Sequence, residues 1–228
     1  MNAIGLTWMR QHTVSATALR MIPIFSGLSA ERIDAVCRMA TMRRVGRGTS
    51  VVLAGENTDY VYFVLNGSLK VVVGDEDGRE VILTLVGQGD VFGEMGVVDD
   101  SPRSATVTAV APSDLVVFSQ ADFRRILQED FDVCLRLMGR LATRLRDADR
   151  KIESLALLDV YGRVARLLLD MAEDVSEHEK IIRKKISKND IAKMIGASRE
   201  MVSRVMKGLE LDEKTLALID ADGDGRIR

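Results

Sequence analysis

The sequence predicts an α+β protein with an N-terminal β-roll or jelly roll, a long helix and a C-terminal winged helix-turn-helix. Three observations predict this class. Short β-branched runs separated by glycine-rich turns fill residues 49–118, which is typical of an antiparallel barrel or sandwich. A heptad pattern of apolar residues then continues for more than three heptads. Two short amphipathic segments joined by a glycine follow it.

The strand-like runs alternate with turn signals such as Asn66-Gly67 and Gly87–Gly89. Before them, residues 14–42 show helical spacing, and Ser29 is a candidate helix cap. Helices do not alternate with the strands, which excludes a doubly wound parallel sheet. The expected strands are Val51–Leu53, Val61–Leu65, Leu69–Val73, Val81–Val86, Val91–Phe92, Ala105–Val110 and Leu115–Phe118.

One long helix is expected to begin at Gln120 or Phe131 and to end at Leu158, with one break near Gln128. Its narrow apolar seam has charged flanks, which favours a parallel homodimer over a helix that only packs on the strand domain. The predicted domains are therefore residues 1–128, 129–158 and 159–228. The seam consists of Phe131, Cys134, Met138, Leu141, Leu145, Ala148, Ile152 and Leu155.

The C-terminal part predicts two short helices and a wing. Ser187–Asp190 resembles a capping box, and the helix that it starts is expected to stop at Gly196. Ser198 can cap the second helix, and Leu216–Ile219 with the following glycine turn would form the wing. The buried stripe expected on the second helix consists of Val202, Val205, Met206 and Leu209.

Positive charge is concentrated in this region. Residues 180–208 hold nine Lys or Arg against two acids, in a chain of net charge −2. Such a basic island favours a nucleic-acid partner. Arginine can donate to guanine in the major groove and glutamate can accept from cytosine. The alternative is an ordinary amphipathic helix with a Glu200–Arg204 pair. The residues expected to face outward on the second helix are Arg199, Glu200, Ser203 and Arg204.

A second functional constellation lies at Phe92–Thr106. Gly93 lets the backbone bend where a side chain would block a ligand, and the N–H groups after it can point at an anion. Arg103 offers a planar fork that matches two phosphate oxygens, and Glu94 can accept from a ribose hydroxyl. These residues predict a site for a ribose linked to a phosphate. The alternative is a hairpin with an incidental surface pair.

Phe92–Met95 followed by Pro102–Thr106 resembles the phosphate-binding cassette of cyclic-nucleotide-binding domains, and Ile186–Leu209 resembles the DNA-reading unit of the cyclic-AMP receptor protein (CRP/FNR) family. The resemblance extends from about Ala18 over nearly the whole chain. It implies a homodimer on palindromic double-stranded DNA, working with RNA polymerase. The implied ligand-binding residues are Gly93, Glu94, Met95, Arg103, Ser104, Ala148 and Asp149. The implied DNA-binding residues are Lys188, Asn189, Ser198, Arg199, Glu200, Ser203 and Arg204.

One pair departs from the family pattern. Members that bind cyclic AMP place a Thr-Ser pair at the base-facing positions, where this chain has Ala148 and Asp149. Ala148 cannot hydrogen-bond through its side chain, and Asp149 can accept from an amino group but adds a charge. Cyclic AMP is the expected ligand. Cyclic GMP, cyclic di-GMP or action without ligand are the alternatives, as is a nucleotide-binding module that acts on a protein partner.

Other classes find no support in the sequence. No apolar run approaches the roughly 20 residues of a membrane span, so a cytoplasmic protein without a membrane partner is expected. Cys37 and Cys134 are too few for an iron–sulfur cluster, and His12 and His178 are isolated, so no metal is expected. Asp220–Gly225 matches half of a calcium loop and is interpreted as the wing turn. No catalytic motif is present, and no enzyme activity is expected.

Overall fold

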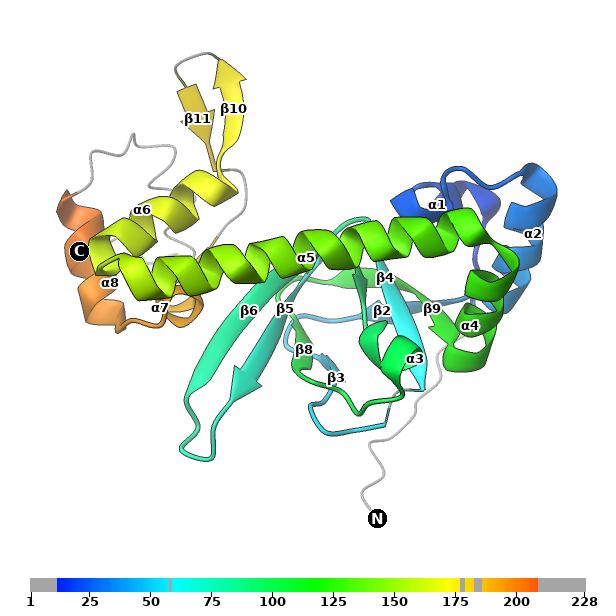
Figure 1. The fold of residues 1–228 in the computed structure, drawn as a ribbon, viewed down its shortest axis with the longest axis horizontal. Helices are drawn as coiled ribbons and strands as arrows, with labels where there is room; N and C mark the ends of the chain where they lie inside the picture. The colour runs from blue at the N-terminus through cyan, green and yellow to red at the C-terminus, as the bar shows by residue number, and fades with distance from the viewer. Residues whose placement is uncertain (1–11, 58, 177–178, 183–185, 209–228) are drawn as a thin grey trace. The chain divides into compact units, whose positions relative to one another are not determined.

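The computed structural model describes residues 12–57, 59–176, 179–182 and 186–208. The chain forms two compact units, residues 1–74 with 83–141 and residues 75–82 with 142–228. Strands dominate the first unit and helices dominate the second (Figure 1). Within the described residues, no helix combines the length and the apolar character that crossing a membrane requires.

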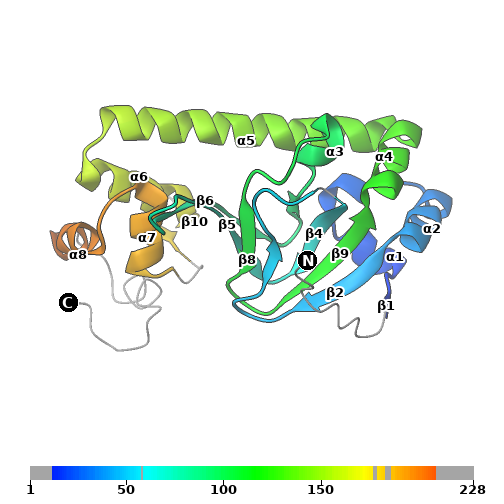
Figure 2. The same ribbon diagram turned by 90° about the horizontal axis from the view of Figure 1, so that it is seen from below.

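The strands of the first unit form two antiparallel sheets, and every predicted strand is present. One sheet has the strand order β1-β2-β9-β4-β7 and the other has the order β3-β8-β5-β6. Figure 2 shows β2, β9 and β4 side by side. The strands are β1 (His12–Thr13), β2 (Thr41–Val45), β3 (Ser50–Val52), β4 (Tyr60–Asn66), β5 (Ser68–Gly74), β6 (Glu80–Gly87), β7 (Val91–Phe92), β8 (Thr106–Ala109) and β9 (Ser113–Ser119).

The central strands β4 and β9 are buried on both faces, which explains why their sequences are almost continuously apolar. Val61 and Phe63 of β4 belong to a core shared with the helices of this unit, whereas Tyr62 and Val64 belong to the core between the two sheets. Phe63 pairs with Val116 of β9 in an antiparallel register. The two cores lie on opposite faces of one sheet, so that sheet is the rigid platform for the loops at its edges.

Helices cover one face of the five-stranded sheet (Figures 1 and 2). Ser29 caps α2, accepting from the Arg32 N–H at 3.2 Å, as predicted. Ser119 caps α4 in the same way, accepting from the Asp122 N–H at 3.1 Å. The helices of this unit are α1 (Ala16–Arg20), the 3₁₀ helix η1 (Pro23–Phe25), α2 (Ala30–Met39), α3 (Met95–Asp99) and α4 (Gln120–Glu129).

Helix α5 (Phe131–Leu157) is the long helix that the heptad pattern predicts. The break before it falls at Asp130, two residues beyond the predicted position, where the backbone leaves the helical region at φ −126°. Arg32 holds this break, because its Nε lies 2.7 Å from Asp130 Oδ2. Most of the large seam side chains are exposed in the single chain, as Leu145 and Ile152 show at 64% each. This exposure is compatible with the predicted homodimer.

The second unit contains a cluster of three helices (Figure 1). Their shared core is made of Val164, Leu168, Ile191, Ile195, Val202 and Met206. Asp159 caps α6, accepting from the Gly162 N–H at 2.8 Å. Leu209 and the expected wing lie outside the described residues. The elements are α6 (Val160–Met171), β10 (Glu173–Ser176), β11 (Glu179–Ile181), α7 (Lys188–Ile195) and α8 (Arg199–Gly208).

Several elements were not predicted from the sequence, namely β1, β2, α3 and the β10–β11 hairpin. Strand β2 has only one buried residue, Val45, and one half-buried residue, Met42, which packs against the helix-covered core. The β10–β11 hairpin joins acidic and basic residues without an apolar alternation. Both depend on main-chain pairing with a partner strand, which leaves little trace in local hydrophobicity.

Candidate functional site

The first candidate site begins where β7 ends. Gly93 follows this strand with φ +78°, a backbone conformation that favours glycine. A Cβ atom at this position would lie 2.4 Å from Arg103 Nη1 and 3.2 Å from the carbonyl oxygen of Tyr60. Glycine is therefore required both by the turn and by the close approach of the Arg103 guanidinium.

Arg103 is only 9% exposed, and its side chain crosses the site. Its Nη1 donates to the Gly93 carbonyl at 2.8 Å, and its Nη2 donates to the Tyr60 carbonyl at 2.6 Å. Its guanidinium carbon lies 5.9 Å from the centre of the Tyr62 ring, within the range of a cation–π contact. The ring of Tyr62 stacks on Phe92, with centroids 4.9 Å apart. The guanidinium is thus fixed from three sides.

The electrostatic setting of Arg103 favours an anion. Burial is the largest influence on its pKa and lowers it below the ordinary arginine value, while Tyr62 and Asp59 oppose this shift. No carboxylate oxygen of the described residues lies within ion-pair distance of its guanidinium, and its hydrogen bonds go to neutral carbonyls. A buried cation whose acceptors are all neutral gains most from a phosphate.

A cavity of about 120 Å³ lies beside Arg103 and Tyr62, and Glu56, Asn57 and Asp59 also line it. Ligand pockets for whole small molecules usually measure about 300 Å³ or more. This cavity has room for one polar part of a nucleotide. Its lining comes from β3, from β4, from the loop between them and from Arg103, so the first unit supplies all of it.

The other residues predicted for the ligand differ in their settings. Glu94 is 1% exposed and contributes to the field at Arg103. Met95 is 53% exposed at the start of α3, and Ser104 is exposed beside Arg103. Ala148 and Asp149 are exposed residues of α5 that belong to the second unit. The structure therefore brings Gly93 and Arg103 into contact, and Glu94, Met95 and Ser104 lie in the same unit.

The second candidate site is the pair of helices α7 and α8. Ser187 caps α7 as predicted, since its hydroxyl oxygen accepts from the Asp190 N–H at 3.0 Å. The same hydroxyl donates to the Asp190 carboxylate at 2.8 Å, in place of the backbone N–H that donates in a capping box. The helix ends at Gly196, which has φ +64°. Arg163 of α6 donates to the Ile195 carbonyl at 2.9 Å, so a third helix holds the tight turn.

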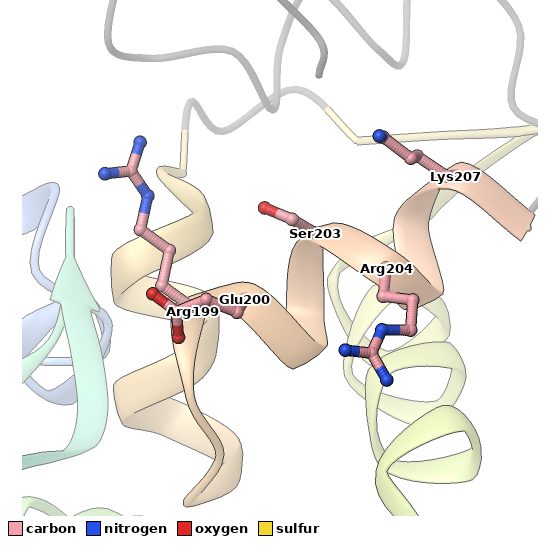
Figure 3. Close-up of a pocket in the computed structure, with 5 residues that line it drawn as sticks. All are labelled: Arg199, Glu200, Ser203, Arg204 and Lys207. Atoms are coloured by element: carbon pink, nitrogen blue, oxygen red, sulfur yellow. The ribbon is translucent and has the colours of Figure 1, made fainter.

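Helix α8 presents a charged surface. Val202 and Met206 are buried at 0% and 2% exposure, whereas Arg199, Glu200 and Arg204 are exposed. Figure 3 shows the lining residues along the helix, with Ser203 and Lys207 on one side and Arg204 on another. An open concavity of about 450 Å³ has this lining: Arg199, Glu200, Ser203, Arg204 and Lys207.

Ser198 has a structural task at the start of α8. Its hydroxyl oxygen accepts from the Met201 N–H at 3.2 Å, which caps the helix. Two hydrogen bonds lower the pKa of the Glu200 carboxylate. The larger contribution comes from its own backbone N–H and the smaller one from the Ser198 hydroxyl. Glu200 is therefore a stable anion, which suits an acceptor of hydrogen bonds.

Among the predicted DNA-binding residues, Lys188 and Asn189 occupy the first turn of α7, with Asn189 exposed and Lys188 half-buried. Lys207 lines the concavity but was not predicted. The signal for it was available, since Lys207 lies four residues after Ser203 on the same helix face. Within the residues that the structure describes, no three His, Cys, Asp or Glu side chains gather as metal ligands would.

Family models match both units. The model described as "Cyclic nucleotide-binding domain" matches residues 42–130, and the one described as "Crp-like helix-turn-helix domain" matches residues 162–214. The cAMP-activated global transcriptional regulator Vfr of Pseudomonas aeruginosa is 35% identical over 196 residues, covering 83% of this chain and 92% of that protein. The cAMP-activated global transcriptional regulator CRP of Pasteurella multocida is 39% identical over 165 residues, covering 71% and 79%.

Solved structures agree with this match. The c-di-GMP responsive global regulator CLP of Xanthomonas campestris has a TM-score of 0.69 and 29% identity, and the alignment covers 82% of this chain and 97% of that one. The catabolite activator protein of Thermus thermophilus has a TM-score of 0.53 and 27% identity, with coverage of 86% and 96%. The names of these relatives include both a cAMP-activated and a c-di-GMP responsive regulator.

Proposed function

Because the chain belongs to the CRP/FNR family of cyclic-nucleotide-binding, DNA-binding transcription regulators, we propose that it binds cyclic AMP through Gly93, Glu94 and Arg103 and reads palindromic DNA as a homodimer through α8. Met95 and Ser104 would complete the contacts to the ribose and the cyclic phosphate. Nucleotide binding would favour the state of the dimer to which it binds more tightly, and this coupling must be reciprocal between nucleotide and DNA.

The observation that carries the nucleotide proposal is the setting of Arg103. Its guanidinium is buried, its pKa is lowered mainly by desolvation, and its hydrogen bonds reach two neutral carbonyls. A cyclic phosphate would place a negative charge in direct contact with the guanidinium through charge-assisted bonds. The carbonyl of Gly93 already orients one edge of the guanidinium, so little side-chain entropy remains to be lost on binding.

A second candidate ligand is cyclic di-GMP. Ala148 and Asp149 stand where cyclic-AMP members of the family carry a Thr-Ser pair, and the structurally similar CLP is described as c-di-GMP responsive. Asp149 would accept from an amino group of a base, which both adenine and guanine offer. The assignment of cyclic AMP rests on the two cAMP-activated relatives at 35% and 39% identity.

Calorimetry against cyclic AMP, cyclic GMP and cyclic di-GMP distinguishes these ligands. We expect saturable binding of cyclic AMP with the highest affinity, at one nucleotide per chain. Tighter binding of cyclic di-GMP would transfer the assignment to the second candidate. Absence of binding to all three nucleotides would leave a regulator that acts without ligand.

The DNA proposal assigns two roles on the helix-turn-helix. Arg199, Glu200 and Arg204 would read base edges, because they are exposed on α8 around one concavity. Lys188 and Asn189, in the first turn of α7, would contact the DNA backbone. Ser198 would act by capping α8, and Ser203 would approach the DNA from the lining of the concavity. RNA polymerase is the proposed protein partner of the DNA-bound dimer.

Arg204→Ala and Lys188→Ala should give different profiles in competition binding at fixed salt. Loss of a base-reading arginine is expected to cost about 1–3 kcal/mol and to relax preference at one base pair in each half-site. Loss of Lys188 should weaken binding to every sequence alike and reduce the salt slope by about one unit. The same profile for both variants across single-base changes of the operator would show that α8 does not read sequence in this way.

A further inference from the structure

Helix α3 is short, and its C-terminal end is held by side chains of α4. A helix of five residues cannot satisfy the carbonyls of its last turn internally. Gln120 Nε2 donates to the Gly96 carbonyl at 3.1 Å, and Arg124 Nε donates to the Val97 carbonyl at 2.9 Å. Both donors come from the first two turns of α4, and all of these residues belong to the first unit.

The residue that ends α3 is also held by α4. Asp100 has φ +56° and ψ +18°. No other non-glycine residue in the described part of the chain has a positive φ. Aspartate adopts this left-handed conformation more readily than most side chains, but it is still less favourable than the right-handed one, so bonds to the Asp100 carboxylate help to maintain it. The Asp100 carboxylate accepts from Arg124 Nη2 and, at 3.3 Å, from Gln120 Nε2. Arg124 thus bonds both to the Val97 carbonyl of α3 and to Asp100, the residue that follows this helix.

This end of α3 leads directly into the nucleotide site. Arg103 follows three residues after Asp100, and its own backbone is fixed, because its N–H donates to the Glu56 carbonyl at 2.8 Å. The other end of the segment is fixed where Arg103 Nη1 meets the Gly93 carbonyl. The segment Gly93–Arg103 is therefore anchored at one end by its own arginine and in the middle by α4.

We propose that Gln120 and Arg124 are positioning residues for the nucleotide: they hold the C-terminal end of α3 and Asp100, and thereby keep the Gly93–Arg103 segment in its binding conformation. This inference rests on the proposed nucleotide site. The Arg124–Asp100 pair is exposed, with side-chain exposures of 40% and 70%, so solvent screens its charge attraction. The geometric restraint on the carbonyls and on the left-handed residue accounts for the effect.

The test compares Arg124→Met with Arg125→Met. Arg125 is the next residue of the same helix, is exposed, and bonds to Glu129 instead of α3, which makes it a matched control. Two measurements are made on each full-length protein: hydrogen exchange of residues 95–101 without ligand, and binding of cyclic AMP, cyclic GMP and cyclic di-GMP. Arg124→Met should accelerate exchange in this segment and weaken binding about tenfold, as expected if the competent state falls to about a tenth. Arg125→Met should match the wild type in both.

Two further variants test the mechanism. Arg124→Lys keeps the charge but cannot reach the Val97 carbonyl and the Asp100 carboxylate together, so an intermediate loss is expected. Arg124→Met combined with Asp100→Asn should weaken binding little more than Arg124→Met alone, because the Arg124 bond is already lost and asparagine keeps an acceptor oxygen for Gln120.

The outcomes separate this inference from the nucleotide assignment. Unchanged exchange in Arg124→Met, or equal effects of Arg124→Met and Arg125→Met, would overturn the positioning role. Faster exchange with unchanged nucleotide affinity would overturn it as well. If the wild type binds none of the three nucleotides, the ligand assignment fails, while accelerated exchange in Arg124→Met alone still supports the hold of α4 on α3.

Discussion

Arg103→Leu is expected to weaken cyclic-nucleotide binding by about tenfold to several hundredfold. Charge-assisted hydrogen bonds contribute about 1.5–3 kcal/mol each, and 1.4 kcal/mol corresponds to a tenfold change in affinity. The arginine is already held at the Gly93 and Tyr60 carbonyls, so its bonds to a phosphate would form without a search for the right rotamer. Calorimetry on wild type and variant measures the difference directly.

The stability of Arg103→Leu must be measured as a control. Leucine removes a desolvated cation, which favours the folded state, but it leaves two carbonyls without their donor, which costs about 1–3 kcal/mol for each that water does not reach. Thermal unfolding shows whether the variant is folded at the temperature of the titration. Arg103→Lys retains the charge without the planar fork and should bind with intermediate affinity.

Arg44→Leu serves as the matched exchange at an exposed position. Its side chain is 83% exposed on β2 and pairs with Asp114 of β9, in the same unit as Arg103. It should bind nucleotide like the wild type. Equal affinities of the wild type and Arg103→Leu would contradict the assignment of the phosphate to Arg103.

Leu145→Asp is expected to convert the dimer into a monomer. Leu145 lies in the middle of the seam on α5 and is 64% exposed in the single chain, next along the seam to the half-buried Leu141. In a twofold dimer the change acts twice, once from each chain. Removing two buried leucines forfeits about 3–6 kcal/mol, and two unpaired carboxylates add to this loss, so the dissociation constant should rise at least about a hundredfold.

Sedimentation measures this result. The wild type should sediment at about twice 25.2 kDa, and Leu145→Asp should shift toward the single-chain mass. Leu169→Asp is the control, because Leu169 is 59% exposed on α6 and lies off the seam. A wild type that remains monomeric both with and without nucleotide would contradict the dimer proposal.

The elements most visible in the sequence are those whose residues are close neighbours along the chain. The heptad seam of α5, the cap at Ser187 and the continuous apolar run of β4 all depend on residues at most four positions apart. Such spacings determine which side of a helix or strand is apolar before any long-range contact forms. Strand β2 was missed for the same reason, since only Met42 and Val45 of its five residues are apolar and its partner β9 lies far along the chain.

The residue types of the nucleotide site were also visible in the sequence, because glycine, acid and arginine fall within one short segment. Their geometry was not. Arg103 donates to a carbonyl ten residues away and to another 43 residues away, so its orientation depends on β4 lying beside β7. The contacts of Gln120 and Arg124 with α3 span 24 and 27 residues. No local periodicity encodes such pairs, because they exist only once the antiparallel strands have brought distant segments into register.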